Sequence, residues 1–600
     1  MPDQTQFTPV SRASAILLAF VAFSSVIVWS FVSGRFGHVG PDGDDVMRLV
    51  QIRDLLAGQG WFDLHQYRLG PEGGVLMHWS RIPEIPILVL YGLFDVFLPS
   101  ETALMWAISV WPPLSMLIVF WGLWLAARNL GDGRVLVFMM IVALAPLFVH
   151  FRFLSGAIDH HNLQIALLAV ALGAGLDAAM RRGQMAIAGV ALGLSVAIGA
   201  ETYPFVGVFC AFYALDWALR GQAARKGAVA FGLAFAGSVA LCFLATVPPA
   251  RWGETWTDTL SLISLAGAVA GGAGLAVAAQ AVSGRELRIR VAALGGVGVA
   301  LAILVLVLAP HALSNPLSQL PAEVRTLWLG NVAEARGMFA PADDRTQFAF
   351  FALGTSVAGL AVSLLAINGG RQVRAHLLIA PLLALSILLM VYQVRFYVFG
   401  HLIAIVPLAL WCAHVFSEGR AGRTSSVAYL LAIAVANPAL WVLPAALIAP
   451  APAEAGGHEA GACLSEEMLA QLNSEPPATI LASENMGAAL LEATHHRALS
   501  GNYHRDAAGI AAALAAFGAA PDAAEDLVRE ADVGLVLYCP GLPGTDILAR
   551  QRPDGFLARL DAGDAPGWLQ PVSEEGTIPG GGRLYRVQPA RSGPAGTPAT

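Results

Sequence analysis

Charged residues and cysteine are scarce in this sequence. Only 13% of its 600 residues are charged, about half the share of an ordinary globular protein, and its 35 basic residues include a single lysine, Lys226. The net charge of −7 offers no basic excess for nucleic acid, and five cysteines are too few for a disulfide scaffold. Apolar residues are abundant instead, at 56% of the chain with a mean hydropathy of +0.63. Water would not tolerate so much apolar surface, so most of the chain is predicted to lie in lipid.

Apolar stretches long enough to cross a bilayer recur between residues 13 and 449. The predicted membrane spans number thirteen: 13–33, 102–127, 135–151, 163–180, 185–200, 203–219, 228–247, 259–282, 291–312, 347–367, 376–394, 396–416 and 425–449. Another stretch, 84–98, is apolar but short and flanked by prolines, which favours a helix lying in the membrane interface. The predicted fold class is therefore an α-helical polytopic membrane protein.

Basic residues in the short loops predict the orientation of these spans. Fifteen of them lie on one side of the membrane, whereas the short connections on the other side carry only Arg152, Arg251 and Arg395. Because basic loops stay in the cytoplasm, the N-terminus is predicted to be cytoplasmic. The first span lacks a small-residue cleavage site after it, so we interpret it as a retained anchor rather than a signal peptide. These features predict a multi-pass protein of a bacterial inner membrane, with its C-terminal region in the periplasm.

Three outward segments are too long to be turns: 34–83, 313–346 and the residues after 450. A Pro/Ala/Gly linker at Ala449–Pro452 separates a predicted membrane domain, 1–449, from a tail domain, 450–600. Strand-like runs alternate with helical patterns in this tail: strands at 479–482, 533–538 and 583–587, helices at 507–517, 523–531 and 544–550. Such alternation predicts a small extracytoplasmic α/β domain.

The first outward segment contains a cluster of carboxylates. Asp42, Asp44 and Asp45 lie within four residues, just outside the first span. They repel one another unless a cation or an arginine neutralises them, and hard divalent cations prefer such oxygens. The alternative is a solvated turn in which an aspartate caps the helix that follows.

A second cluster, Asp159-His160-His161, follows Ser155-Gly156 in the outward connection between the third and fourth spans. An aspartate and a histidine two positions apart at the head of a helix can bind one metal ion. Alternatively, Asp159 merely caps the fourth span and the histidines meet lipid headgroups.

Two further candidates lie in outward segments. Glu334 is a carboxylate in an apolar setting, and the same segment contains rival acids: Glu323, Asp343 and Asp344. Arg395 stands beside Phe396 at the outer end of the eleventh span. An arginine there commonly extends its charge to the headgroups, but it also suits a lipid-linked phosphate through bidentate hydrogen bonds.

This layout resembles the single-subunit oligosaccharyltransferases of bacteria and archaea and the eukaryotic oligosaccharyltransferase catalytic subunit, which belong to the GT-C class of glycosyltransferases. Those proteins have thirteen spans, an aspartate in a first outer loop, a long later outer loop and an outward C-terminal domain. Their second motif reads Asp-x-Asp or Asp-x-Glu, whereas this chain keeps Asp159 and has His161 in place of the second acid. The resemblance covers the whole architecture and is closest over residues 13–416.

The resemblance implies transfer of a sugar from a polyprenyl phosphate or diphosphate donor at the outer membrane face. Asp44 and Asp159 would hold Mn²⁺ or Mg²⁺ with His161 as a possible ligand, and a nitrogen ligand favours Mn²⁺. Asp44 and Glu334 would be catalytic, and Arg395 would bind the donor phosphate. Additional candidates for the site are Asp42, Asp45, His160 and Arg152.

The expected acceptor is where the chain departs from the family. The Trp-Trp-Asp motif, which by resemblance reads an Asn-x-Ser/Thr sequon, is absent from the tail, where Trp568 is the only tryptophan. The tail has a basic cluster instead: His495, His496, Arg497, His504 and Arg505. These residues either face solvent or suit an anionic group, so a glycan or lipid acceptor is expected in preference to a protein.

Other readings of the chain stay open at this point. A transporter or flippase of lipid-linked sugars would carry charge within its spans, whereas the acids here lie at the outer rim. A sensor anchored in the membrane would need fewer spans. Cys463 and Cys539, the only cysteines of the tail, form a disulfide in an oxidising periplasm or stay as two buried thiols.

Overall fold

The chain forms two compact units in the computed structural model, which describes residues 12–310, 316–332, 334–339, 346–448, 463–572 and 582–589. The first unit contains residues 1–40, 79–316 and 334–452. The second contains residues 41–78, 317–333 and 453–600, so large parts of two outward segments group with the tail. Asp343, Asp344 and the predicted linker lie outside the described residues.

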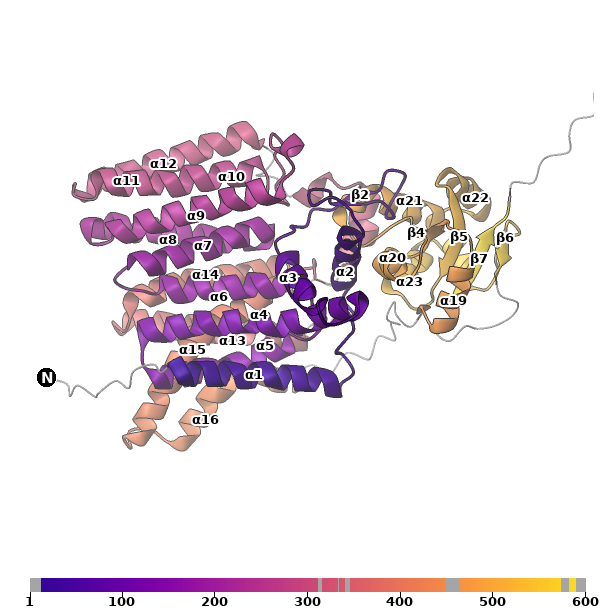
Figure 1. The fold of residues 1–600 in the computed structure, drawn as a ribbon. Coiled ribbons are helices and arrows are strands. Elements are labelled where there is room, and N and C mark those ends of the chain that lie inside the picture. Colours follow the sequence, from indigo (N-terminus) through magenta and orange to yellow (C-terminus); the bar gives the residue numbers. More distant parts are fainter. Residues whose placement is uncertain are drawn as a thin grey trace, which may run out of the picture. The chain divides into compact units, whose positions relative to one another are not determined.

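Apolar helices, most of them long, build the first unit, and Figure 1 shows many of them side by side. Their bounds are α1 (Arg12–Val32), α3 (Glu84–Phe94), α4 (Ser100–Leu130), α5 (Gly133–Val149), α6 (His161–Gly175), α7 (Arg182–Ile198), α8 (Tyr203–Arg220), α9 (Arg225–Thr246), α10 (Leu262–Ala268), α11 (Gly274–Val282), α12 (Leu287–Leu308), α13 (Thr346–Asn368), α14 (Val373–Tyr392), α15 (Tyr397–Arg420), α16 (Ser426–Val435) and α17 (Val442–Ala446). A π-helical segment, η4 (Val269–Ala273), joins α10 to α11 within one span.

Each predicted span corresponds to a helical segment. Among the described residues, nine helices are long and apolar enough to cross a membrane. Three predicted spans correspond to shorter helices of 15 to 17 residues, α5, α6 and α7. The last span is broken at Asn437-Pro438, where its two halves are bent by 92°, because proline disfavours helical backbone in the residue before it. The predicted fold class is confirmed: a helical polytopic membrane protein with a C-terminal α/β region.

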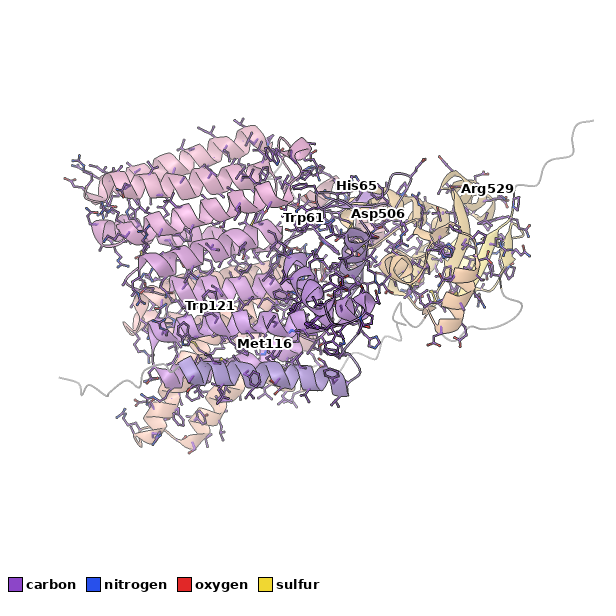
Figure 2. All side chains as sticks on the ribbon, viewed as in Figure 1. Trp61, His65, Met116, Trp121, Asp506 and Arg529 are labelled. Carbon is purple, nitrogen blue, oxygen red and sulfur yellow. A yellow bond between two sulfur atoms is a disulfide. The ribbon has the colours of Figure 1, made fainter. Side chains whose placement is uncertain are left out.

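The outer faces of these helices are apolar, as lipid requires. On α4, Met116 is buried whereas Trp121 is 44% exposed, and Figure 2 labels both residues. The helix α12 has a mean hydropathy of 2.8 over its most apolar window, and none of that window is buried by protein. Such faces would be costly in water but are stable against acyl chains.

Two glycines bring α4 and α6 into close contact. A Cβ on Gly173 would lie 2.0 Å from the carbonyl oxygen of Gly122, and a Cβ on Gly122 would lie 2.5 Å from that of Ala169. Small residues at facing positions let the backbones of membrane helices approach and pack tightly. This contact fixes α6, whose first turn carries part of the Asp159-His160-His161 cluster.

A five-stranded mixed sheet forms the core of the second unit, in the order β4-β3-β5-β7-β6. Its strands are β3 (Thr479–Leu481), β4 (Arg497–Ala498), β5 (Val533–Tyr538), β6 (Leu569–Pro571) and β7 (Arg583–Val587). The strands β4, β3 and β5 are parallel, and β7 is antiparallel to both of its neighbours, with Val536 opposite Tyr585. The predicted strands β3, β5 and β7 are confirmed, whereas β4 and β6 are too short to leave a pattern in the sequence.

Helices flank this sheet and close its core. They are α19 (Glu466–Ser474), α20 (Gly487–Ala493), α21 (Ala507–Gly518), α22 (Pro521–Glu530), α23 (Pro543–Gln551) and α24 (Phe556–Asp561). Leu481, Val536 and Phe556 are among the fully buried core residues. The disulfide between Cys463 and Cys539, with Cα atoms 6.0 Å apart, joins the start of this domain to the end of β5 and confirms the bridged alternative.

The first outward segment is held to the tail within the second unit. Its helix α2 (Gly43–Leu56) packs against α20, and Arg53 Nη1 donates a hydrogen bond to Glu492 Oε1 at 2.7 Å. Arg68 donates to the backbone carbonyls of Leu491 and Thr494. A short hairpin of β1 (His65–Gln66) and β2 (Val75–Leu76) completes the segment. These contacts explain why residues 41–78 group with the tail.

Candidate active site

Asp159, His160 and His161 form a buried cluster at the head of α6. Asp159 Oδ1 lies 2.5 Å from His160 Nδ1, and Asp159 Oδ2 contacts His161 Nδ1. The two imidazole rings stack with their centroids 4.4 Å apart. One ligand atom from each residue lies within 4.8 Å of the others. The N-cap of α6 is His160, and its side chain makes no capping hydrogen bond.

Gly156 shapes the connection that leads to this cluster. Its φ of +86° is a left-handed conformation that favours glycine, and a Cβ there would lie 2.4 Å from the carbonyl oxygen of His38. The N–H of Gly40 donates to the Gly156 carbonyl at 2.9 Å. Gly156 therefore packs the chain leaving α1 against the turn that precedes Asp159.

The electrostatics of the cluster suit a cation. Burial opposes charge on His160, but the carboxylates of Asp159 and Glu201 raise its pKa to about 10. Burial would likewise raise the pKa of Asp159, but His160 and His161 hold it well below its usual value. Two imidazole nitrogens and a carboxylate oxygen are a donor set for a borderline divalent metal, which competes with protons for the nitrogens. The residues present therefore fit a divalent metal ion.

Glu201 connects the cluster to Arg395, and the sequence analysis missed it. It lies in η1 (Ala200–Thr202), with Oε2 3.8 Å from His160 Nε2 and Oε1 3.9 Å from Arg395 Nη1. The amide of Gln164 donates to Glu201 Oε2 at 3.2 Å. A signal was available, because Glu201 is a single carboxylate between two apolar spans on the predicted outer side.

Arg395 also lies close to Glu334. Arg395 lies in η9 (Val394–Phe396), and its Nη1 is 3.9 Å from Glu334 Oε1. The backbone supports this contact, since Val394 N–H donates to the Arg336 carbonyl at 3.0 Å. Gln393 Oε1 accepts from Arg395 Nε at 3.2 Å and from Nη2 at 3.1 Å. The guanidinium is therefore fixed by three neighbours rather than extended freely toward headgroups.

The carboxylates of the first outward segment belong to the second unit. Asp42 Oδ1 accepts the N–H of Asp44 at 3.1 Å, so Asp42 has the capping role that the sequence allowed. Asp45 is buried on α2, and Tyr503 Oη donates to the Gly43 carbonyl at 3.1 Å. The candidate Arg152 is half-buried in the first unit, between α5 and α6.

Comparison with solved structures identifies the fold. The archaeal oligosaccharyltransferase AglB from Archaeoglobus fulgidus, in complex with an inhibitory peptide and a dolichol-phosphate, aligns with a TM-score of 0.62 at 16% identity, over 86% of this chain and 69% of that chain. The same organism's oligosaccharyltransferase tethered to an acceptor peptide with an NVT sequon aligns at 0.60 and 15%, over 88% and 69%. Its complex with Zn and sulfate aligns at 0.55 and 16%, over 83% and 63%.

This chain has the oligosaccharyltransferase fold. No family model matches its sequence, and no curated protein does either. The resemblance drawn from the span number, the outer segments and the tail is confirmed at the level of the fold. At 15–16% identity the backbone arrangement is shared with few of the side chains.

Three of the five residues in the basic tail cluster contact backbone atoms. His495 Nε2 lies 3.0 Å from the Glu475 carbonyl, and Arg497 donates to the Pro71 carbonyl at 3.0 Å. His496 Nε2 donates to the Leu472 carbonyl at 2.7 Å while its Nδ1 accepts the Ala478 N–H at 3.2 Å. These contacts give His495, His496 and Arg497 structural roles. The ring of His504 lies 4.3 Å from that of His78.

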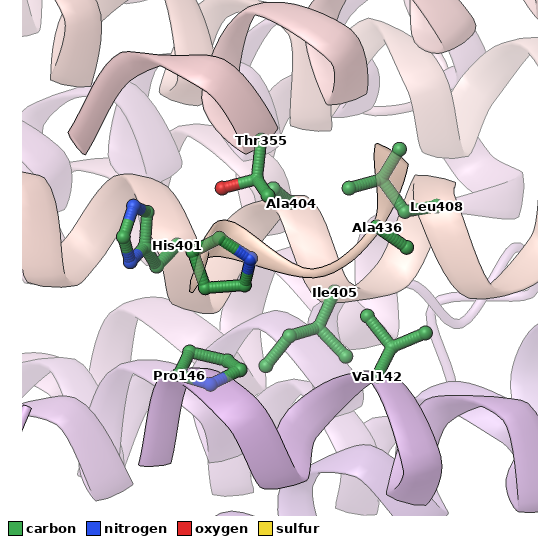
Figure 3. Close-up of a pocket in the computed structure, with 9 residues that line it drawn as sticks. Val142, Pro146, Thr355, His401, Ala404, Ile405, Leu408 and Ala436 are labelled. Atoms are coloured by element: carbon green, nitrogen blue, oxygen red, sulfur yellow. The ribbon is translucent and has the colours of Figure 1, made fainter. Parts of the chain in front are cut away.

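His401, which pairs with His150, lines a small pocket inside the first unit of this oligosaccharyltransferase fold. Figure 3 shows the lining, which includes Pro146, Thr355, His401 and Ile405. His401 Nδ1 lies 2.9 Å from His150 Nε2, and His401 Nε2 lies 3.1 Å from the Ala352 carbonyl. Only two lining side chains are polar, so this pocket is unsuited to a sugar.

Proposed function

We propose that this protein is a metal-dependent membrane glycosyltransferase of the oligosaccharyltransferase type. It moves a sugar or oligosaccharide from a polyprenyl phosphate or diphosphate donor to an acceptor at the outer face of the membrane. The chain of contacts from the Asp159 cluster through Glu201 to Arg395 and Glu334 carries this proposal. The dolichol-phosphate in the archaeal structure of the same fold supports a lipid-linked donor.

The Asp159 cluster would hold the metal. Asp159 and His161 are the proposed ligands, and His160 is available beside them. One archaeal structure of the fold is a complex with Zn and sulfate, which supports a divalent cation in this proposal. Mn²⁺ suits imidazole ligands better than Mg²⁺ does. The ion would supply positive charge where negative charge develops on the leaving phosphate.

Arg395 would bind the donor phosphate and Glu334 the acceptor. Gln393 holds one edge of the guanidinium, which presents Nη1 between two carboxylates. In the reaction, the bond between the anomeric carbon and the phosphate oxygen breaks, and a bond forms to the acceptor nucleophile. Glu334 would orient the acceptor and accept the proton that the nucleophile loses, and the polyprenyl phosphate or diphosphate would leave as the anion that Arg395 stabilises.

The proposed orientation has the site and the tail on the periplasmic side of a bacterial inner membrane. Basic residues in the opposite loops support it. The Cys463–Cys539 disulfide adds support, because disulfides persist in oxidising compartments.

For the acceptor, we propose a glycan or a lipid in preference to a sequon asparagine. The support is the absence of Trp-Trp-Asp from the tail sequence. The basic tail cluster no longer adds to it, since three of its members bind backbone. Incubation with lipid-linked donor and a sequon peptide, followed by mass spectrometry, tests the choice. Efficient metal-dependent glycopeptide formation would assign a protein acceptor and contradict this part of the proposal.

Glycan profiling of a deletion strain tests the proposed function as a whole. Loss of the protein should remove one glycan from the cell and leave its lipid-linked precursor in the membrane. Wild-type protein should restore the glycan and Asp159→Ala should not. Glu254→Gln, which changes a carboxylate on another outer connection, is the matched control and should restore it. If purified protein moves a lipid-linked sugar across a vesicle bilayer without glycosidic transfer, the alternative of a transporter or flippase holds.

A further inference from the structure

Glu201 touches both halves of the proposed site. One carboxylate oxygen faces His160, a member of the metal cluster, and the other faces Arg395, the proposed phosphate residue. Gln164 Nε2 donates to the oxygen that faces His160, which orients the carboxylate. Glu201 is therefore a bridge between two sites whose residues are far apart in the sequence.

The local structure holds Glu201 in this position. A Cβ on Gly199 would lie 2.6 Å from Glu201 Oε2 and 2.8 Å from Gln164 Nε2, so only glycine leaves room for the side chain to fold back. Thr202 Oγ1 donates to the Ser195 carbonyl at 3.1 Å, and Tyr203 Oη donates to that of Val196 at 3.3 Å. These bonds tie the short η1 turn to α7 and limit its movement.

We propose that Glu201 is a positioning residue that couples metal binding to donor-phosphate binding, an inference that rests on the proposed function. His160 Nδ1 lies against Asp159 and His160 Nε2 lies 3.8 Å from Glu201 Oε2, so a proton on Nε2 would point at that carboxylate. A carboxylate on the far nitrogen of a histidine fixes its tautomer and strengthens the other nitrogen as a ligand. The same carboxylate attracts Arg395. A change of charge at His160 therefore alters the interaction of Glu201 with Arg395, and the reverse holds as well.

The coupling has a definite sign. Glu201 is an anion close to the proposed phosphate position, so it opposes donor binding by itself. A divalent cation beside His160 offsets that charge and leaves Arg395 freer to bind phosphate. The donor phosphate is therefore expected to bind more tightly when the metal is present, and the metal more tightly when the phosphate is present.

Binding measurements on Glu201→Gln test this inference in the full-length protein in detergent. The probes are Mn²⁺ followed by electron paramagnetic resonance, and undecaprenyl phosphate in mixed micelles. The variant should bind Mn²⁺ roughly 10- to 100-fold more weakly. Its affinity for undecaprenyl phosphate should depend on Mn²⁺ much less than that of the wild type does. Glu254→Gln should match the wild type in both measurements.

Glu201→Asp provides the second variant, because it keeps the charge and shortens the side chain by one methylene group. It should retain more of the coupling than Glu201→Gln, whereas equal loss in both variants would indicate packing alone and overturn the inference. Mn²⁺ affinity and coupling within twofold of wild type in Glu201→Gln would also overturn it. If Asp159→Ala still loses Mn²⁺ in that case, the proposed function survives. If wild-type protein binds neither Mn²⁺ nor undecaprenyl phosphate, the proposed function itself is overturned, and the inference about Glu201 with it.

Discussion

Two pairs of adjacent histidines in this protein have opposite chemistry. His160 and His161 face the carboxylate of Asp159, and although burial opposes it, that charge helps raise the pKa of His160 to about 10. His495 and His496 instead lie against backbone carbonyls, and burial lowers the pKa of His496. The same dipeptide is thus a charged site in one unit and a structural element in the other.

The partners of the imidazoles account for the difference. A carboxylate stabilises the protonated ring. When the ring is neutral, the carboxylate orients it as a metal ligand. His496 donates through Nε2 and accepts through Nδ1, so its neutral form satisfies both nitrogens and a second proton would break the bond from Ala478. The two pairs therefore differ in what contacts their ring nitrogens, a carboxylate in one and backbone in the other.

The largest expected effect is the loss of Mn²⁺ binding and of glycosyl transfer when Asp159 is removed. Asp159→Ala is expected to abolish Mn²⁺ binding and to lower glycosyl transfer by roughly 10³-fold or more, because the charge that a metal provides is worth several kcal/mol. The counterpart His496→Ala should leave Mn²⁺ binding unchanged and destabilise the tail by about 1–3 kcal/mol. Mn²⁺ titration and hydrogen exchange on both variants measure this. Undiminished transfer in excess chelator would contradict the metal proposal.

Breaking the disulfide should affect the second unit alone. Replacing Cys463 and Cys539 by serine removes a cross-link between residues 76 positions apart, which is worth about 4 kcal/mol in the chain-entropy model. Amide protection in β3 and β5 should fall, measured by hydrogen exchange of the full-length protein. Mn²⁺ binding at the Asp159 cluster should stay the same, and its loss would show that the two regions are not independent.

The stability of the tail should depend on pH through Asp506, which lies in η12 (His504–Asp506). Burial raises its pKa from 3.8 to about 7, although Oδ2 accepts the N–H of Gly501 at 2.7 Å. The folded state therefore holds a proton that the unfolded state releases between these two values. Stability of the tail should fall as pH rises from about 4 to about 7, by up to a few kcal/mol at about 1.4 kcal/mol per pKa unit. Asp506→Asn should flatten this slope in hydrogen exchange, and an unchanged slope would assign it to another group.

The smallest effect is expected at the donor end of the site. Arg395→Lys keeps the charge but loses the planar fork, so affinity for undecaprenyl phosphate should fall by roughly 1–3 kcal/mol. Arg251→Lys is the matched control, since Arg251 lies on an outer connection and pairs with Glu254 at 2.7 Å. Equal affinity of both variants for undecaprenyl phosphate would indicate that Arg395 only extends its charge to the lipid headgroups.

Much of the site could be predicted from the sequence. Asp159, Glu334 and Arg395 stand at turns between apolar runs, and placing them on one side of the membrane requires only the order of the spans. The direct Arg395–Glu334 contact agrees with that prediction. The tail histidines were a weaker case, since no local pattern shows that His496 meets the carbonyl of Leu472.

Local sequence patterns are sufficient to predict the apolar helices, the longer strands of the tail and the polar turns that carry charge. These depend on apolar periodicity and length, which neighbouring residues settle among themselves. Tertiary packing was needed to show that Glu201 bridges His160 and Arg395, and that residues 41–78 group with the tail. The partners in such contacts are distant in the sequence and are brought together by packing, of which the close approach of Gly122 and Gly173 is an example. Short-range sequence patterns do not predict which distant residues will pack together.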